Sequence, residues 1–281
     1  MEVAIPPGGK AGGDMSCESE DRVDLGLTGK VALVAAASKG LGKASALSLA
    51  REGARVTICA RSEAELAAAA AEIRTETGAE VLTVPADLSG ADGISAVVEA
   101  TAARFGGIDI LVNNSGGPAL GKFADFTDDD WRLAFEVVTL NFVRFVRQVV
   151  PYMQRNGWGR IVGIQSSSVK QPVAGIDLSN GTRPGVAGLM KALMPDLAKD
   201  GITINLVLPG SFLTERLLGH AARDSDTAAN LQAAAAQNIP VGRLGEPNEL
   251  GDLVTFLASP RAAYITGAVY QIDGGIIRSH V

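Results

Sequence analysis

The stretch that decides the fold spans residues 31–60 and reads VALVAAASKGLGKASALSLAREGARVTICA. It opens on a short apolar run at residues 31–35 and ends with a second one at residues 55–59. Between these runs, small and apolar residues recur near the helical period through residues 41–50, and Gly53 stands where a helix-ending glycine is expected. A strand, a helix and a second strand in this order predict one unit of a parallel sheet.

The same alternation of short strand-like runs and longer helical patterns continues along the chain. It predicts an α/β fold, a single doubly wound Rossmann domain over residues 28–281 with a seven-stranded parallel sheet flanked by helices. Ser62 is a plausible N-cap of an Ala- and Glu-rich helix that stops at Gly78. Residues 1–27 show no such period and predict a disordered leader. The predicted strands cover residues 31–35, 55–59, 80–84, 108–112, 160–164, 202–206 and 268–272.

Composition excludes several classes of function. The 281-residue chain carries a net charge of −6, so it offers no basic stripe for a nucleic acid. Its two cysteines, Cys17 and Cys59, provide no disulfide framework or thiol metal cluster, and His220 and His280 have no metal-ligand spacing. No apolar run approaches the roughly 20 residues of a membrane span. We therefore expect a soluble cytoplasmic protein without a metal, membrane or nucleic-acid partner, acting on a small molecule.

The loop after the first predicted strand places two glycines, Gly40 and Gly42, at the start of a helix. Backbone amides and the helix dipole favour an anion at such a position, as in sites for a dinucleotide pyrophosphate. A glycine cluster alone is a weak signal, and a plain structural turn is its default interpretation. Its position between a strand and a helix strengthens the prediction of a phosphate loop.

Three further motifs accompany this loop in a fixed order. They are Asn-Asn-Ser-Gly at residues 113–116, Tyr-Ile-Thr-Gly at residues 264–267 and Asp-Gly-Gly at residues 273–275. Together with the glycine loop they make the chain similar to the short-chain dehydrogenase/reductase family, over about residues 28–277. Within that family, the combination of Val138, Ser166, Ser179 and Arg183 resembles a divergent subgroup near the 3-oxoacyl-[acyl-carrier-protein] reductases.

Two residues depart from the family's phosphate loop, which reads Thr-Gly-x-x-x-Gly-x-Gly. Ala35 and Ala36 replace the threonine and the first glycine. Because an alanine methyl group would stand where only a hydrogen usually does, we expect a small shift of the turn and weakened cofactor binding.

The second predicted strand ends without the acidic residue that would accept hydrogen bonds from the adenosine ribose hydroxyls. Arg61 and Lys39 offer positive charge suited to a 2′-phosphate instead, which predicts NADP(H) over NAD(H). Alternatively, both are solvated surface cations. The resemblance and the loop together predict as cofactor-binding residues Ser38, Lys39, Gly40, Leu41, Gly42, Arg61, Ser62, Asp87, Leu88, Asn114, Ser115, Gly116, Arg183, Pro209, Gly210, Phe212 and Thr214.

The related reductases use Asn, Ser, Tyr and Lys as their catalytic set. Alignment by the family's spacing places the Asn position on Val138, one helical turn before Asn141. The Ser position falls on Ser166, the Tyr position thirteen residues later on Ser179, and the Lys position on Arg183. The resemblance therefore implies an atypical tetrad with Ser166, Ser179 and Arg183 as the candidate catalytic residues.

The chemistry of these side chains limits what they can do. An alcohol is a far weaker acid than a phenol, whose pKa is about 10, so Ser179 does not simply replace a tyrosine as proton donor. A packing or capping role for Ser179 stays open. Arg183 keeps a cation and several donors for ribose binding and charge stabilisation. We interpret Lys170 and Asp177 as surface charges. The resemblance places His220 in the loop that covers substrate.

Three functions are compatible with this set. The first is an NADP(H)-linked oxidoreductase acting on a carbonyl or alcohol substrate. The second is a cofactor-binding protein without redox turnover, serving as a regulatory or partner subunit of an active homologue. The third is a non-redox isomerase or lyase in which Ser166 and Arg183 donate to an oxyanion.

The resemblance also implies quaternary structure and a substrate cover. Helices starting near Asp128 and Leu178 form dimer faces in the related family, and the region of residues 273–275 often completes a tetramer. We therefore expect a homodimer or homotetramer. The segment 211–239 is expected to be a loop that closes over substrate.

Overall fold

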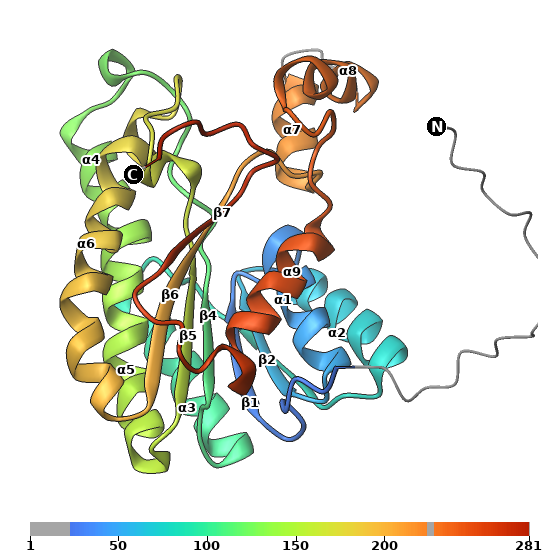
Figure 1. Cartoon of the computed structure of the whole chain (residues 1–281), viewed down its shortest axis with the longest axis vertical. Coiled ribbons are helices and arrows are strands. Elements are labelled where there is room, and N and C mark those ends of the chain that lie inside the picture. The colour runs from blue at the N-terminus through green and yellow to red at the C-terminus, as the bar shows by residue number, and fades with distance from the viewer. Residues whose placement is uncertain (1–22, 224–227, 281) are drawn as a thin grey trace, which may run out of the picture.

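The computed structural model describes residues 23–223 and 228–280, so the predicted leader lies almost wholly outside the described residues. A seven-stranded sheet runs through the molecule in the order β3-β2-β1-β4-β5-β6-β7, and every neighbouring pair is parallel (Figure 1). The predicted α/β fold with seven parallel strands is therefore confirmed. The strands are β1 (Val31–Ala35), β2 (Arg55–Ala60), β3 (Val81–Pro85), β4 (Ile110–Asn113), β5 (Gly159–Ile164), β6 (Ile202–Pro209) and β7 (Val269–Ile272).

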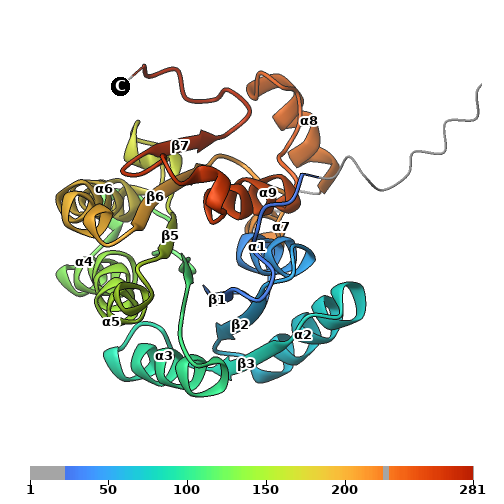
Figure 2. The ribbon, with the colours of Figure 1, turned by 60° about the horizontal axis from the view of Figure 1, so that its bottom comes forward.

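Helices cover both faces of this sheet, as Figure 2 shows in a view near the strand axes. One face carries α1 (Gly40–Arg51), α2 (Glu63–Thr77) and α9 (Pro247–Leu257). The other carries α3 (Ala91–Phe105), α5 (Asn141–Asn156) and α6 (Asp177–Lys199), with the short α4 (Asp128–Phe135) beside α6. None of the helices in the described ranges is long and apolar enough to cross a bilayer.

Local sequence explains where α2 begins and ends. The Ser62 hydroxyl accepts a hydrogen bond from the Glu65 amide at 3.3 Å, so Ser62 is the N-cap. At the other end Gly78 adopts the left-handed conformation with φ of 69°. Both predicted ends of this helix are confirmed.

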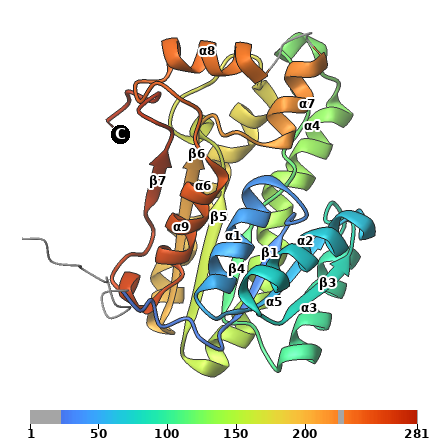
Figure 3. The ribbon, with the colours of Figure 1, turned by 90° about the vertical axis from the view of Figure 1, so that its right-hand side faces the viewer.

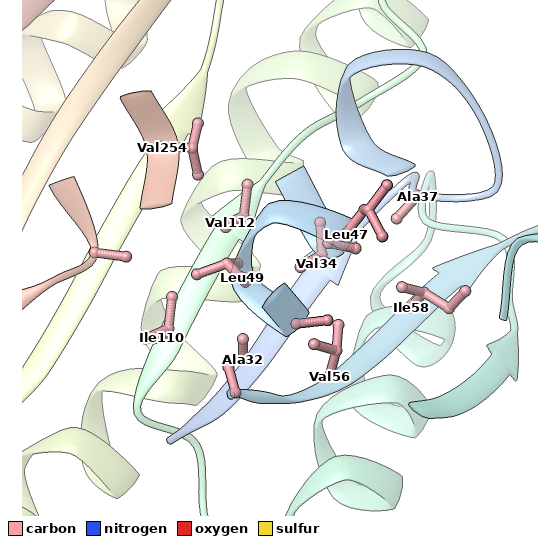
Figure 4. Close-up of a cluster of buried hydrophobic side chains, with 14 of the residues drawn as sticks. Ala32, Val34, Ala37, Leu47, Leu49, Val56, Ile58, Ile110, Val112 and Val254 are labelled. Atoms are coloured by element: carbon pink, nitrogen blue, oxygen red, sulfur yellow. The ribbon is translucent and has the colours of Figure 1, made fainter. Parts of the chain in front are cut away.

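Two apolar clusters pack on opposite faces of the sheet. The first joins β1 and β2 to α1, α2 and α9, and Figure 4 shows Leu47 and Leu49 of α1 among the side chains of the central strands. The second joins the opposite face of the same strands to α3, α5 and α6 and includes Phe142 and Phe145, both fully buried. Because both faces are covered, the strands are mostly apolar, and several of their polar residues, such as Thr57 and Asn205, are themselves buried.

The segment 211–239 differs from the prediction of a loop. It forms two helices, α7 (Glu215–Arg223) and α8 (Ala228–Asn238), and Figure 3 places both beyond the carboxyl ends of the strands. The Thr214 hydroxyl accepts from the Leu217 amide at 3.3 Å, which helps begin α7, and the alanine-rich α8 follows helix propensity. The prediction of a loop was therefore wrong, although the segment lies at the expected end of the sheet.

Candidate active site

The carboxyl ends of β1, β4, β5 and β6 meet at one edge of the sheet, where the chain order of the strands reverses between β1 and β4. In open α/β sheets, ligands bind in the crevice at this point. The loop after β1 leads directly into α1, whose N-cap residue Lys39 is extended and makes no side-chain capping bond. The first amides of α1 thus have no side-chain acceptor in the helix cap, which suits an anionic ligand.

Two close contacts define the shape of this loop. A Cβ atom on Gly42 would lie only 2.4 Å from the Ala36 carbonyl oxygen, so this position requires glycine. Gly40 has φ of 53°. Ala36 itself has φ of 49°, a left-handed conformation that an alanine adopts at a cost of about 1–2 kcal/mol. The loop therefore keeps its tight turn and holds Ala36 in a strained conformation.

Replacing Ala36 with glycine should relieve this strain. We expect Ala36→Gly to raise the free energy of unfolding by about 1 kcal/mol, because glycine reaches positive φ without a steric penalty. Urea unfolding followed by circular dichroism measures the change. The neighbouring variant Ala37→Gly is the control, since Ala37 is buried and is not among the residues with positive φ. Ala37→Gly should lower the free energy of unfolding. An equal decrease in Ala36→Gly and Ala37→Gly would contradict the assignment of strain to Ala36.

Lys39 and Arg61, the two cations predicted to bind a 2′-phosphate, differ in their surroundings. The Lys39 ammonium forms a 2.6 Å ion pair with Glu65, whose carboxylate also accepts from the Ser38 hydroxyl at 3.3 Å. The hydrogen bond and charge of Glu65 raise the pKa of Lys39, and the same bond lowers the pKa of Glu65. Arg61 is exposed, and its charge contributes to lowering the pKa of Asp87, behind the hydrogen bonds from Ser89. Arg61 is thus available to a ligand, whereas Lys39 already has a carboxylate partner.

A second group of polar residues surrounds the end of β4. The Asn114 side-chain amide donates to the Ala36 carbonyl at 3.3 Å and so ties this strand end to the phosphate loop. Asn141 is 1% exposed; its oxygen accepts from Asn113 at 2.9 Å and its nitrogen donates to the Leu88 carbonyl at 2.8 Å. Asn141 therefore fixes the β3 and β4 ends to each other. Ser115 is half-buried and Gly116 is exposed beside them.

The residues after β5 meet the first turns of α6 in a buried polar network. Arg183 is 7% exposed; its Nε donates to the Ser179 hydroxyl at 3.0 Å and its Nη1 to Gln165 Oε1 at 3.1 Å. Ser179 also shares a 3.2 Å hydrogen bond with the Ser168 hydroxyl. Ser166 Oγ accepts from the Ser168 amide at 3.2 Å. The structure thus brings Ser166, Ser179 and Arg183 together at one strand end, with Ser168 between the two predicted serines.

Burial determines the electrostatics of this network. Desolvation, and after it the charge of Arg216, lowers the pKa of Arg183 to about 10. The guanidinium therefore stays protonated at neutral pH in a site that is nearly closed to water. A charge held in such surroundings acts more strongly on a nearby oxyanion than the same charge in water.

Arg216, at the start of α7, is a site residue that the sequence did not reveal. A Cβ on Gly117 would lie 2.9 Å from Arg216 Nη1 and 3.2 Å from Arg183 Nη2, so both guanidinium groups reach the same point beside the β4 loop. Arg216 Nη2 donates to the Pro118 carbonyl at 3.2 Å. The only signal in the sequence was a basic residue two positions after Thr214, inside a segment interpreted as a loop.

The other predicted residues have varied surroundings. Val138 is 2% exposed and lies in the apolar cluster. Lys170 donates to Gln271 at 3.1 Å, and Asp177 accepts from the Phe123 amide at 2.7 Å, so both have structural partners. The side chain of His220 lies outside the described residues.

The segment after β6 faces the phosphate loop from the other side. A Cβ on Gly40 would lie 3.4 Å from the Thr214 methyl group, which brings the start of α7 against α1. Pro209 and Gly210 end β6, and a Cβ on Gly210 would meet Asp273 at 2.7 Å. Phe212 is 6% exposed, and a Cβ on Gly245 would lie 2.7 Å from its ring. The Phe212 side chain thus packs inward, while Thr214 borders the glycine loop.

Neither a metal nor a reactive thiol is indicated in this region. No cluster of three or more His, Cys, Asp or Glu side chains able to hold an ion occurs among the described residues. Cys59 is buried at the end of β2, and desolvation raises the pKa of its thiol to about 12. The polar groups that the described residues gather at this strand end are the loop amides, the serines and the two arginines.

An open parallel sheet with a glycine loop at a helix N-terminus defines a Rossmann-type α/β protein. Residues 35–277 match the family described as enoyl-(acyl carrier protein) reductase. The chain belongs to the short-chain dehydrogenase/reductase family.

Individual relatives agree with this assignment. A 3-oxoacyl-[acyl-carrier-protein] reductase of Vibrio cholerae is 34% identical over 252 residues, covering 90% of this chain and 99% of its own. The crystal structure of L-sorbose reductase from Gluconobacter frateurii, complexed with NADPH and L-sorbose, matches with a TM-score of 0.87 and 34% identity over 92% of this chain and 100% of that one. An actinorhodin polyketide ketoreductase with NADPH matches with a TM-score of 0.84 and 34% identity, covering 89% and 98%.

Proposed function

We propose that this protein is an NADP(H)-linked oxidoreductase that interconverts a carbonyl and an alcohol on a small molecule, using an atypical active site. The observation that carries the proposal is the buried guanidinium of Arg183, which Gln165 and Ser179 aim at the ligand-binding edge of the sheet. The family supports reductase chemistry, and two related structures contain NADPH. In this proposal Ser179 and Arg183 stand where active relatives carry tyrosine and lysine, and Val138 stands at the asparagine position.

The phosphate loop fits a dinucleotide. The first backbone amides of α1 have no side-chain cap and can donate hydrogen bonds to the pyrophosphate. A Cβ at Gly42 would clash with the Ala36 carbonyl, so glycine keeps the tight turn through which the backbone can approach the pyrophosphate. We assign Ser38 and Leu41 to the loop, Arg61 and Ser62 to binding of the 2′-phosphate, and Asp87 with Leu88 to binding of the adenine. In the same proposal Asn114, Ser115 and Gly116 contact the ribose, and Thr214 faces the loop from α7. When bound, the nicotinamide supplies the hydride.

The protein's own residues then have to bind the carbonyl and stabilise its developing negative charge. Ser166, at the end of β5, is placed to donate a hydrogen bond that orients the carbonyl. Arg183 supplies the fixed positive charge, held by Gln165 and Ser179 so that little reorganisation is needed. The Ser179 hydroxyl accepts from Arg183 and can donate its own proton to the substrate oxygen, with Ser168 behind it. Because an alcohol is a very weak acid, Ser179 has to receive a proton from solvent in the same step, so it relays a proton and does not become an alkoxide.

The direct test is NADPH oxidation, followed at its absorbance band, across ketones, aldehydes and oxo acids. Equilibrium binding of NADPH and NADH is measured in parallel. Turnover of at least one carbonyl class, with tighter binding of NADPH than of NADH, is the expected result. Tight NADPH binding without oxidation of any substrate would contradict the redox function and leave a cofactor-binding subunit instead.

A second candidate follows from the chemistry of the Arg183 network. A guanidinium beside two hydroxyl groups can stabilise an enolate, which would suit a non-redox isomerase or lyase. Product formation that is independent of added NADPH would favour this function. Consumption of one NADPH for each product would exclude it.

The ion pair between Lys39 and Glu65 predicts how the cofactor preference can be tuned. We expect Glu65→Gln to tighten NADPH binding about threefold to tenfold, because it frees the Lys39 ammonium for the 2′-phosphate. NADH binding should stay unchanged. Conversely, Arg61→Ala should weaken NADPH by a similar factor and spare NADH.

Fluorescence titration of both nucleotides measures these effects. Glu72→Gln is the matched control, since Glu72 pairs with Lys43 on the same helices without touching Lys39. Equal changes for NADPH and NADH in either variant would contradict the assignment of these cations to the 2′-phosphate.

A further inference from the structure

Two guanidinium groups converge beside Gly117 in the loop after β4. A Cβ on Gly117 would lie 3.2 Å from Arg183 Nη2 and 2.9 Å from Arg216 Nη1. These two nitrogens are therefore separated by no more than the sum of the two distances. Gly117 has φ of 71° and no side chain, and the two guanidinium groups occupy the space that a side chain would need.

Three nitrogens of the pair are already engaged. Arg183 uses Nε and Nη1 for Ser179 and Gln165, and Arg216 uses Nη2 for the Pro118 carbonyl. Arg183 Nη2 and the Nη1 and Nε of Arg216 are left without a protein acceptor among the residues whose side chains the structure describes, 23–219 and 229–280. Two of these three donors, Arg183 Nη2 and Arg216 Nη1, lie beside each other at Gly117.

No acidic side chain in the same ranges forms an ion pair with either arginine. Other arginines of this chain do have such partners: Arg144 pairs with Glu136, and Arg243 pairs with Glu249. Two like charges held close together in a partly dry site repel each other unless an anion lies between them. The arrangement is therefore incomplete without a negatively charged ligand.

We propose that Arg183 and Arg216 bind a carboxylate on the substrate, so that the protein acts on a short oxo acid or hydroxy acid. A carboxylate has two oxygens that can each accept from one guanidinium. Since Arg183 also donates to Ser179 at 3.0 Å, a carboxylate on Arg183 would lie close to a carbonyl that Ser179 contacts, which favours 2-oxo and 3-oxo acids. This inference rests on the proposed function for its reaction, but the anion site itself can be tested by binding alone.

The alternative source of an anion is the diphosphate of the cofactor. The glycine loop at the start of α1 already offers a place for that group, and it lies at the end of β1, whereas Gly117 follows β4. The geometry thus favours a group on the substrate, and the experiment distinguishes the two.

The test compares acetoacetate with methyl acetoacetate and 2-oxobutyrate with methyl 2-oxobutyrate. Binding of each probe is measured by calorimetry in the presence of NADP⁺, and NADPH oxidation gives KM and kcat. We expect at least one acid to bind about tenfold or more tightly than its ester. Arg216→Gln should raise the dissociation constant of that acid, and its KM, by about 10- to 100-fold, a much larger factor than the same variant produces for the ester or for NADPH.

Arg104→Gln is the matched control. Arg104 lies on α3, forms an ion pair with Glu80, and belongs to no part of the site. The proposal is overturned if neither acid binds more tightly than its ester, or if Arg216→Gln weakens NADPH and not the acid. If no probe is reduced but an acid still binds through Arg216, the anion site stands and the redox function fails. If esters and acids are reduced equally well, the redox function stands and the carboxylate site fails.

Discussion

Gly42→Ala should reduce NADPH affinity about 100-fold or more and lower the free energy of unfolding by about 1–3 kcal/mol. The added methyl group would lie 2.4 Å from the Ala36 carbonyl oxygen and 3.0 Å from the Ala37 Cα, and both contacts are with backbone. No side-chain rotation can relieve them, so the turn itself has to open. Opening the turn moves the first amides of α1 away from the position at which they would meet the pyrophosphate.

NADPH titration and urea unfolding measure the two effects. Gly107→Ala is a matched control, because a Cβ at Gly107 meets nothing within 4 Å and Gly107 is not among the glycines with positive φ. The control should bind NADPH like the unmodified protein and change stability by less than about 0.5 kcal/mol. Normal NADPH binding by Gly42→Ala would mean that the cofactor does not use this loop.

Arg183→Met should lower carbonyl reduction about 100- to 1,000-fold, the loss typical of one preorganised donor to an oxyanion. Methionine fills a similar volume but removes the charge and the donors to Ser179 and Gln165. Removing a buried charge recovers its desolvation cost, so the free energy of unfolding should change by only about 1–2 kcal/mol. Arg183→Lys keeps the charge but lacks the planar fork, and we expect a loss of about tenfold.

The pH dependence gives an independent check on Arg183. Its pKa in the folded protein is lowered from 12.5 to about 10, so the charged form is disfavoured by folding. Below pH 10 Arg183 is protonated in both the folded and the unfolded protein, and the desolvation of its charge lowers the free energy of unfolding. This loss of stability disappears as the pH rises from about 10 to 12.5, because the folded protein then holds Arg183 in its neutral form. Activity that depends on the cation should hold at neutral pH and fall above about 10.

Initial rates and unfolding as a function of pH test this assignment. Retention of most activity by Arg183→Met, or of activity well above pH 10, would show that another group stabilises the developing charge. Lys191→Met, on the same helix but outside the polar network, should keep its activity and controls for nonspecific effects of the substitution.

The fold was predictable because its signal is distributed over the whole chain. Seven short apolar runs, of which the first six are each followed by a helical pattern, leave few arrangements other than a covered parallel sheet. The helix from Glu63 to Thr77 was placed with both of its caps, since Ser62 and Gly78 act through local geometry. The helices α7 and α8 were missed because the segment was interpreted from its role in related proteins, although its alanine content favours a helix.

The site was only partly predictable because several of its contacts join distant parts of the chain. The spacing from Ser166 to Ser179 and Arg183 located the strand end and the facing helix. It could not reveal that a short turn at Ser167–Val169 places Ser168 against Ser179. The pairing of Lys39 with Glu65 depends on how two helices pack, which no local pattern encodes.

The charges of Lys39 and Glu65 beside the phosphate loop and the charge of Arg183 at the end of β5 differ in burial, so they respond differently to ionic strength. Lys39 and Glu65 keep 51% and 41% of their side-chain surface exposed, so dissolved ions screen their interactions with a phosphate. Only 7% of the surface of residue Arg183 is exposed, so dissolved ions reach its charge poorly. A rise in salt should therefore release the adenosine end of a dinucleotide first, while the charge at the reacting end keeps its strength. Added salt should thus raise the dissociation constant of NADPH by a larger factor than it lowers the rate of the bound complex.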